Sequence, residues 1–208
     1  MNNWIFDSKI EKIYNEHVLA HIPNYERVIQ KSLDICQHTC TSTDLIIDIG
    51  CANGSTLKKL HDLGFRNLYG VESSKEMIEN FDESLATIII SNQFPKNVYK
   101  VVLANWVLHF IKNKEDYLKD IYDNLDNNGT LILSEKTNTS SELIYFYHLF
   151  KRRSGVTEKE IFEKSKSLEN VMFINSIDWY TNTLKSIGFK NVEIIDADWC
   201  FTTFYIKK

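Results

Sequence analysis

The stretch Leu45–Leu57, LIIDIGCANGSTL, constrains the fold of this chain more than any other segment. Four apolar residues surround one acid, and the chain then turns at Gly50 and Gly54, where glycine can adopt a positive φ and let a ligand approach the backbone. This order predicts a short buried strand, a tight turn and a helix. In an open α/β sheet, such a turn lies at the carboxyl end of its strand, where ligands bind.

Strand and helix patterns alternate along most of the chain. Apolar strands that alternate with helices are typical of a parallel sheet covered on both faces, and two final strand-like segments lie close enough to pair as an antiparallel hairpin at the sheet edge. We therefore expect a doubly wound α/β fold with a mostly parallel, seven-stranded sheet. The strands are predicted at 45–50, 67–72, 87–90, 99–106, 130–136, 191–199 and 201–208, and the helices at 7–20, 24–37, 55–63, 74–84, 114–125, 140–151, 157–166 and 176–187.

A chain of 208 residues without repeats or linkers is long enough for one core, so we expect a single domain. Its four expected parts are N-terminal helices (1–42), a cofactor-binding half (43–136), a helical acceptor-site insertion (137–175) and a last helix with the hairpin (176–208). Asp7 and Asn24 are the expected N-caps of the first two helices. The turn Asn127-Asn128-Gly129 is expected to end the helix at 114–125.

Composition excludes several classes of protein. A net charge of -4 argues against general binding to nucleic acid. There is no secretory signal pattern and no apolar run near the roughly 20 residues that a membrane-spanning helix needs, so a cytoplasmic protein without membrane contact is expected. The four cysteines lack zinc-finger spacing, and His17 and His21 lack a third ligand, so we expect no metal site.

Two motifs together predict a nucleoside site. The pattern DIGCANG, which starts at Asp48, resembles the acid-x-G-x-G-x-G motif of S-adenosylmethionine binding, with Ala52 in place of the middle glycine. Glu72 ends the next strand, where an acid can accept hydrogen bonds from ribose hydroxyls. The alternative is that the two glycines only shape a tight connection. A nicotinamide dehydrogenase is disfavoured, because its G-x-G-x-x-G spacing is met here only by Gly50.

Longer segments carry a closer resemblance, which spans most of the chain. HIPNYERVI, VESSKEMIE, ANWVLHFI, LILSEK, FKRRSGVTEKEI and SLENVM resemble the carboxy-S-adenosylmethionine synthases. Those enzymes are a branch of the class I methyltransferase fold that makes a modified cofactor from S-adenosylmethionine and prephenate for tRNA wobble-uridine modification. The resemblance implies the class I fold, S-adenosylmethionine as cofactor and a homodimer.

The same resemblance implies a set of cofactor contacts. Ser91 and Asn92 stand where the family has an aspartate near the adenine amino group, so that contact is changed or lost. The expected cofactor-binding residues are Tyr25, Asp48, Gly50, Cys51, Ala52, Gly54, Glu72, Ser73, Ser91, Asn92 and Asn105.

Ser165 stands where the family has an arginine that grips the carboxylate of the modified cofactor. A hydroxyl cannot replace a bidentate guanidinium, and the loss of such a partner in a desolvated pocket costs about 2 to 5 kcal/mol. We therefore favour transfer of an ordinary methyl group to a small-molecule acceptor. Two alternatives remain open: synthase activity with carboxy-S-adenosylmethionine held by Lys164, Lys166, Arg152 or Arg153, and a catalytically silent module that binds S-adenosylmethionine.

The acceptor side is expected between the fourth strand and the helices after the fifth. A base is useful if the acceptor must lose a proton, and His109 is the best-placed candidate, with His148 and Tyr147 as further candidates. The alternative for each of them is that the side chain only packs in the core. The basic residues that follow Tyr147 and His148 would then form a solvated end of their helix. The expected acceptor pocket consists of Trp106, Tyr145, Lys151, Arg152 and Ser165.

Overall fold

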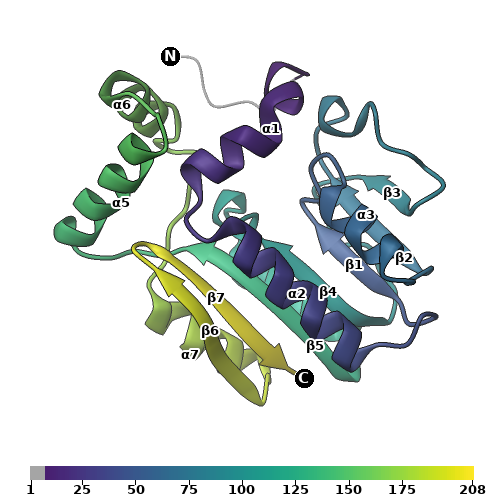
Figure 1. Cartoon of the computed structure of the whole chain (residues 1–208). Coiled ribbons are helices and arrows are strands. Elements are labelled where there is room, and N and C mark those ends of the chain that lie inside the picture. Colours follow the sequence, from purple (N-terminus) through teal and green to yellow (C-terminus); the bar gives the residue numbers. More distant parts are fainter. Residues whose placement is uncertain (1–7) are drawn as a thin grey trace.

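The structure is a computed structural model that describes residues 8–208, with side chains described from residue 14 onward. One seven-stranded sheet forms its centre, in the order β3-β2-β1-β4-β5-β7-β6 (Figure 1). Asp7, an expected helix cap, lies outside the described residues. The strands are β1 (Ile46–Ile49), β2 (Leu68–Glu72), β3 (Thr87–Ile90), β4 (Tyr99–Asn105), β5 (Leu125–Lys136), β6 (Asn191–Asp198) and β7 (Phe201–Lys207).

The pairing of the strands confirms the expected fold class. Strands β1 to β5 are parallel, whereas β7 pairs antiparallel with both β5 and β6. The strand order reverses at β1, which pairs with β2 on one side and β4 on the other. In doubly wound sheets, ligands bind at this switch point.

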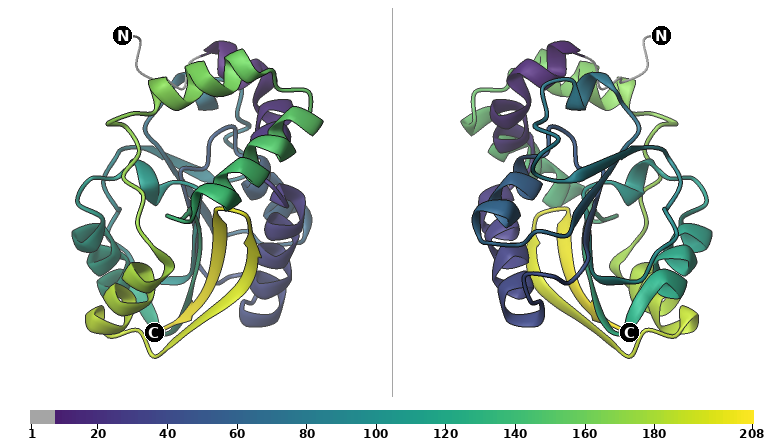
Figure 2. Two further views of the ribbon diagram at one scale, coloured as in Figure 1. Left: turned by 90° about the vertical axis from the view of Figure 1, so that its left-hand side faces the viewer. Right: turned by 90° about the vertical axis from the view of Figure 1, so that its right-hand side faces the viewer.

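Alternating side chains divide the core into two layers. Ile47 belongs to a cluster with α4 and α7, whereas the neighbouring Ile46 belongs to a cluster with α2 and α3. Figure 2 shows these helices on opposite faces of the sheet, and α1, α5 and α6 beyond the ends of the strands. The helices are α1 (Ser8–His21), α2 (Tyr25–Thr39), α3 (Ser55–Asp62), α4 (Lys114–Asn124), α5 (Ser141–Arg153), α6 (Glu158–Ser167) and α7 (Ile177–Ile187), with 3-10 turns η1 (Glu76–Ile78) and η2 (Leu108–Phe110). No helix in the described part is long and apolar enough to cross a membrane.

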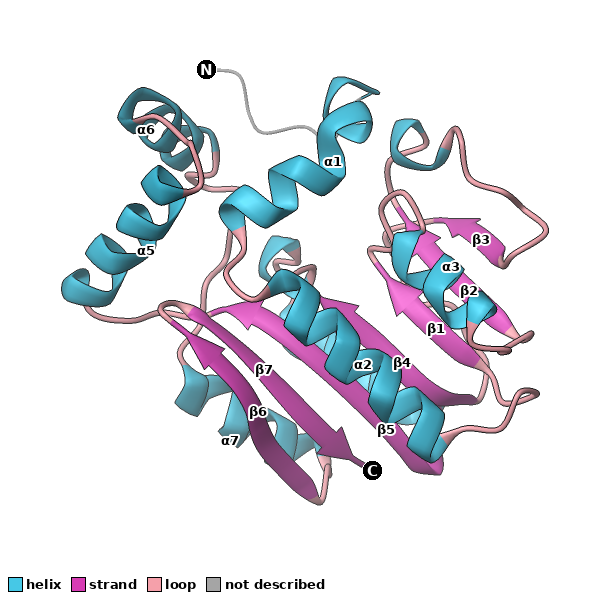
Figure 3. Ribbon diagram, viewed as in Figure 1, coloured by secondary structure: helices cyan, strands magenta, loops and turns pink. Residues whose placement is uncertain are grey.

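The segment between β2 and β3 differs from the predicted helix at 74–84. Only the short turn η1 forms there, and the rest is loop (Figure 3). The Ser74 hydroxyl accepts a hydrogen bond from the Met77 amide, and the Asp82 carboxylate accepts one from the Ser84 amide. Such local side-chain bonds compete with helical hydrogen bonding.

Two predicted helix boundaries are also corrected. Asn24 does precede α2, but with a φ of 58° its side chain makes no capping bond and donates instead to Asp198 of β6. The turn Asn127-Asn128-Gly129 does not end α4, because β5 already begins at Leu125. The turn forms an irregularity within β5, whose register with β4 shifts between Tyr99 and Val101.

A buried carboxylate ties α2 to the edge strand β6. The side chain of Asp196 is 4% exposed and accepts hydrogen bonds from Arg27 Nε at 2.8 Å, Arg27 Nη2 at 2.9 Å and Lys31 Nζ at 2.8 Å. Burial favours the neutral acid, but the bonds from Arg27 and Lys31 outweigh it and lower the pKa of Asp196. The inward-facing charge also protects the edge of the sheet against pairing with another chain.

We expect Asp196→Ala to lower the free energy of unfolding by about 2 kcal/mol, measured by urea denaturation. The loss of a fully buried partner costs about 3 to 5 kcal/mol, but Arg27 and Lys31 are 55% and 36% exposed and can return to water. The control is Asp62→Ala, which removes an exposed pair with Lys58 and should cost below about 1 kcal/mol. Equal losses in the two variants would contradict the structural role of Asp196.

Candidate functional site

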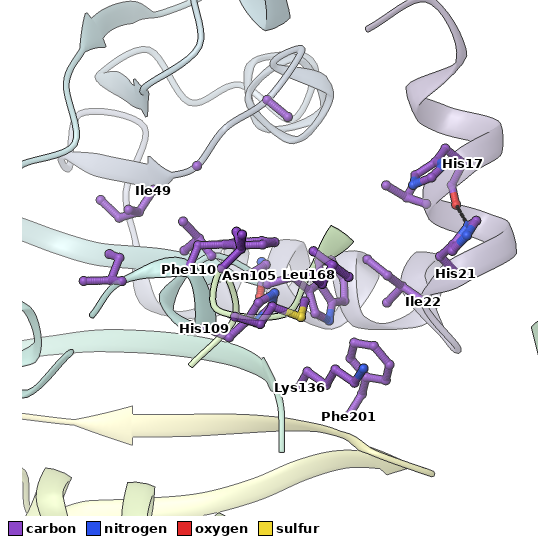
Figure 4. A pocket seen from close by; sticks show the side chains of 18 of the residues that line it. His17, His21, Ile22, Ile49, Asn105, His109, Phe110, Lys136, Leu168 and Phe201 are labelled. Carbon is purple, nitrogen blue, oxygen red and sulfur yellow. Dashed lines mark hydrogen bonds between the residues drawn. The ribbon is translucent and has the colours of Figure 1, made fainter. Parts of the chain in front are cut away.

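A cavity of about 390 Å³ lies at the carboxyl ends of the parallel strands, at the switch point of the sheet. Its lining comes from the ends of β1, β2, β4 and β5 and from α1, α5 and α6, and Figure 4 shows part of it as sticks. Cavities of this size hold small molecules and cofactors. Elements that are distant in sequence therefore share one binding space.

The turn after β1 needs glycine at two positions. Gly50 has a φ of 66°, and a Cβ atom there would lie 2.7 Å from Val107 Cγ2. Gly54 has a φ of 75°, and a Cβ there would lie 2.3 Å from the Phe81 ring. Ala52, which stands where the binding motif has glycine, also adopts a positive φ of 50°. The turn keeps its left-handed geometry at all three positions, despite the alanine.

Glu72 joins this turn to the loop after β2. Its Oε2 accepts a hydrogen bond from the Ala52 amide at 3.0 Å, and its Oε1 accepts from the amides of Ser73 at 2.7 Å and Ser74 at 2.9 Å. A carboxylate can accept about four hydrogen bonds, so Oε2 retains room for a hydroxyl donor. Glu72 and Ser73 both line the cavity, together with Ser91 and Asn92 from the end of β3.

Four of the expected cofactor residues are not among the described residues that line the cavity: Tyr25, Asp48, Cys51 and Gly54. The Tyr25 ring stacks on Trp106, with 4.9 Å between the ring centroids, and Trp106 does line the cavity. Cys51 is buried in the core cluster with α2 and α3. Asp48 is also buried, and this burial together with the nearby Glu72 raises its pKa to about 8.

Asn105 offers a donor that the described protein does not use. Its Oδ1 accepts a hydrogen bond from Ser134 Oγ at 2.6 Å, which orients the amide, and its Nδ2 is buried without a hydrogen-bond partner in the described part of the chain. An unsatisfied buried donor costs about 1 to 3 kcal/mol. Because Asn105 lines the cavity beside the glycine turn, this orphan amide fits a cofactor that presents an acceptor atom, as S-adenosylmethionine does.

A buried carboxylate holds the imidazole of His109 at the cavity wall. Glu135, which is fully buried, lies with Oε2 3.1 Å from His109 Nδ1 and accepts a hydrogen bond from the Tyr180 hydroxyl at 2.9 Å. Its Oε1 accepts from the Leu108 amide at 2.8 Å. The arrangement directs Nδ1 to the carboxylate and leaves Nε2 without a partner among the described residues. His109 lines the cavity (Figure 4).

Helix α5 presents only one of its faces to the cavity. Tyr147, His148 and Lys151 line it, at spacings of one, three and four residues. Tyr145 and Arg152 are not among the described residues that line the cavity, so the structure does not place these two expected pocket residues in it. Tyr145 is 57% exposed, and Arg152 forms an ion pair with Glu158 at 2.9 Å.

Helix α6 brings a lysine to the cavity beside the expected serine. Ser165 lines the cavity, but its hydroxyl donates to the carbonyl of Phe162 in its own helix. Lys164 also lines the cavity and donates to His17 Nε2 of α1 at 2.5 Å. Burial first, and then Lys164, lower the pKa of His17 to about 3, so this imidazole is neutral.

Several lining residues were not predicted from the sequence, namely Tyr14, His17 and His21 of α1 and Lys136 at the end of β5. Glu135 was not predicted either, although it holds His109. The sequence did contain a signal for two of these residues, Glu135 and Lys136. Glu135 and Lys136 are charged residues that directly follow an apolar strand, which places them at the same edge of the sheet as the glycine turn.

Comparison with known proteins finds a matching family, relatives that are similar in sequence over most of the chain, and solved structures with a similar fold. The family described as "Methyltransferase domain" matches residues 39–194. The carboxy-S-adenosyl-L-methionine synthase of Nautilia profundicola is 28% identical, with 96% of this chain and 92% of that protein covered. The synthase of Histophilus somni strain 129Pt is also 28% identical, covering 93% and 89%. The solved S-adenosylmethionine-dependent methyltransferase of Archaeoglobus fulgidus has a TM-score of 0.65 at 13% identity, covering 94% and 99%.

We expect the stability of the protein to depend on the protonation of Asp48. Because its folded pKa of about 8 lies above the ordinary 3.8, its contribution is fully present below pH 3.8 and is lost as the pH rises to about 8. Asp48→Asn, which keeps the shape without a titrating proton, should flatten this decline and be more stable than the unchanged protein at pH 8 to 9, by on the order of a few kcal/mol.

Urea denaturation from pH 5 to 9 measures the difference between the two proteins. Asp62→Asn, at an exposed position on α3, is the control and should follow the unchanged protein. Parallel curves for the unchanged protein and Asp48→Asn would show that Asp48 is ionised in the fold.

Proposed function

Because the chain belongs to the methyltransferase-domain family and is an enzyme of the S-adenosylmethionine-dependent class, we propose that it transfers a methyl group to a small-molecule acceptor in the cavity. The observation that carries the proposal is the lining itself. It joins a glycine turn and the orphan amide of Asn105 to the imidazole of His109, and no arginine is among the described residues that line it. An arginine is what the resemblance to the synthases leads one to expect.

The cofactor would lie along the glycine turn. Gly50 and Ala52 would leave room for its methionine part, Asn105 Nδ2 would donate to one of its acceptor atoms, and Glu72 Oε2 would accept from a ribose hydroxyl. When bound, S-adenosylmethionine supplies a methyl group activated by its sulfonium. The protein mainly aligns the acceptor with that group and excludes water.

His109 is the proposed base. Its Nε2 would take the proton from a hydroxyl group of the acceptor as the oxygen gains the methyl group, or from an ammonium group before its nitrogen attacks. The bond from the methyl carbon to sulfur breaks, and S-adenosylhomocysteine leaves. Glu135 stabilises the resulting imidazolium through Nδ1, and Tyr180 holds Glu135 in place through its hydroxyl. Glu135 and Tyr180 are positioning residues in this proposal, because they act through His109.

Synthase chemistry is the second candidate function, and one observation favours it. Lys164, next to Ser165, lies on the cavity wall and could hold the carboxylate of a carboxylated cofactor as a point charge. This alternative is the activity for which two relatives of the chain are named. Arg152 and Lys166 do not support it: Arg152 pairs with Glu158, and Lys166 Nζ lies 4.5 Å from the centroid of the exposed Phe162 ring, outside the described lining.

Mass spectrometry of the nucleoside that co-purifies with the protein separates the two candidates. We expect S-adenosylmethionine or S-adenosylhomocysteine, and we expect Ser165→Arg to increase affinity for carboxy-S-adenosylmethionine more than tenfold, because a guanidinium adds a charged pair with the carboxylate. Carboxy-S-adenosylmethionine bound to the unchanged protein would favour the synthase. Tight binding without any S-adenosylhomocysteine formed across an acceptor panel would favour the silent module.

Removal of the base tests the mechanism. We expect His109→Gln to lower kcat about 100-fold or more, while calorimetry shows affinity for S-adenosylmethionine within about twofold of the unchanged protein, since the imidazole acts on the acceptor. Tyr180→Phe should lower kcat less, because it removes one bond to Glu135 and leaves His109 in place. His61→Gln, on α3 and outside the described lining, is the control. Unchanged kcat in His109→Gln would remove His109 from the mechanism.

A further inference from the structure

Two lysines converge on the cavity from separate elements. Lys136 ends β5 and Lys151 lies in the last turns of α5, and both line the cavity. Lys151 is only 5% exposed. Lysine is seldom buried to this extent unless it is paired with an acid, so the buried ammonium group of Lys151 calls for a partner.

The described protein supplies no such acid. Neither Lys136 nor Lys151 forms an ion pair with a residue whose side chain is described. The nearby acids are engaged elsewhere: Glu135 holds His109, Glu158 pairs with Arg152, and Glu160 closes the capping box of α6.

An aromatic ring holds the two ammonium groups near each other. Lys136 Nζ lies 5.1 Å and Lys151 Nζ 4.5 Å from the centroid of the Tyr147 ring, which attracts cations weakly compared with a carboxylate. Burial, and then repulsion from Lys136, lower the pKa of Lys151 to about 8. Lys164 adds a further basic group to the same region.

This basic region is distinct from the expected place of the cofactor. Figure 4 shows Lys136 and Phe201 on the side of the cavity near His21, and Ile49, which precedes the glycine turn, at the opposite end. His109 and Asn105 lie between them in the same view. Lys136 therefore lies toward the part of the cavity left for the acceptor, and the ammonium group of Lys151 lies near it, over the same Tyr147 ring.

We propose that Lys136 and Lys151 form an oxyanion-binding subsite, with Lys164 beside it, that takes a carboxylate or phosphate group of the acceptor. The inference rests on the proposed function and specifies its substrate class as an anionic small molecule. The paired charges anchor one end of the acceptor, and the group that is methylated extends toward His109.

Binding of inorganic phosphate and of malonate tests the subsite without turnover. Thermal shift and calorimetry are run at constant ionic strength, because exposed charge effects are screened by salt, with and without saturating S-adenosylhomocysteine. We expect at least one anion to bind the unchanged protein under both conditions. Lys136→Gln and Lys151→Gln should each weaken that binding about tenfold or more, and the tighter anion identifies the group that the acceptor carries.

Matched variants show that the effect belongs to the subsite. Lys166→Gln, which removes an exposed lysine of α6 outside the described lining, should bind the anion as the unchanged protein does. Both subsite variants should keep their affinity for S-adenosylhomocysteine, and Lys151→Gln should melt no lower than the unchanged protein without anion, because it removes a buried charge.

Three results would overturn the inference: no binding of either anion, equal binding by the subsite variants, or loss of anion binding when S-adenosylhomocysteine is present. The last would assign the lysines to the carboxylate of the cofactor. Failure of the proposed function looks different, because anion binding would persist in a protein that never forms S-adenosylhomocysteine from S-adenosylmethionine.

Discussion

The carboxylate of Glu72 is the interaction on which the site depends. It accepts hydrogen bonds from the amide of Ala52 in one loop and from the amides of Ser73 and Ser74 in the next, so it joins the ends of β1 and β2 at the switch point of the sheet. The hydrogen bond from the Ala52 amide to this carboxylate fixes the position of the left-handed turn from Gly50 to Gly54. One buried acceptor therefore fixes two of the loops that line the cavity relative to each other.

Charge is distributed unequally around the cavity. Glu72 lies at the end near β1 and β2, the basic side chains of α5, α6 and β5 lie at the other, and the Glu135–His109 pair lies on the wall formed by β5 and η2. A ligand with a cationic and an anionic end is oriented by such a field before any close contact forms. Methyl transfer requires this kind of alignment, because the protein contributes position more than covalent chemistry.

Sequence patterns predicted the fold more completely than the site. The alternation of apolar strands with helices indicated a parallel sheet with an antiparallel hairpin at its edge. The helices predicted to start at Ser140, Thr157 and Ser176 begin one residue later, with these three residues as their N-caps. The predictions were wrong where a local sequence pattern is compatible with two different structures. The segment 74–84 has a helical pattern, but local hydrogen bonds from its polar side chains prevent a regular helix, and Asn24 bonds to a distant strand instead of capping α2.

The sequence by itself determined the sheet, the glycine turn and the acid that ends β2, because each depends on local periodicity or on a backbone angle that few residues adopt. Only the tertiary structure decided which face of α5 lines the cavity, so that Lys151 enters it and Tyr145 does not. It also decided that Glu135 holds His109, 26 residues away in the chain. These pairings depend on the rotation of helices and on the ends of separate strands meeting at one edge, which no short stretch of sequence encodes.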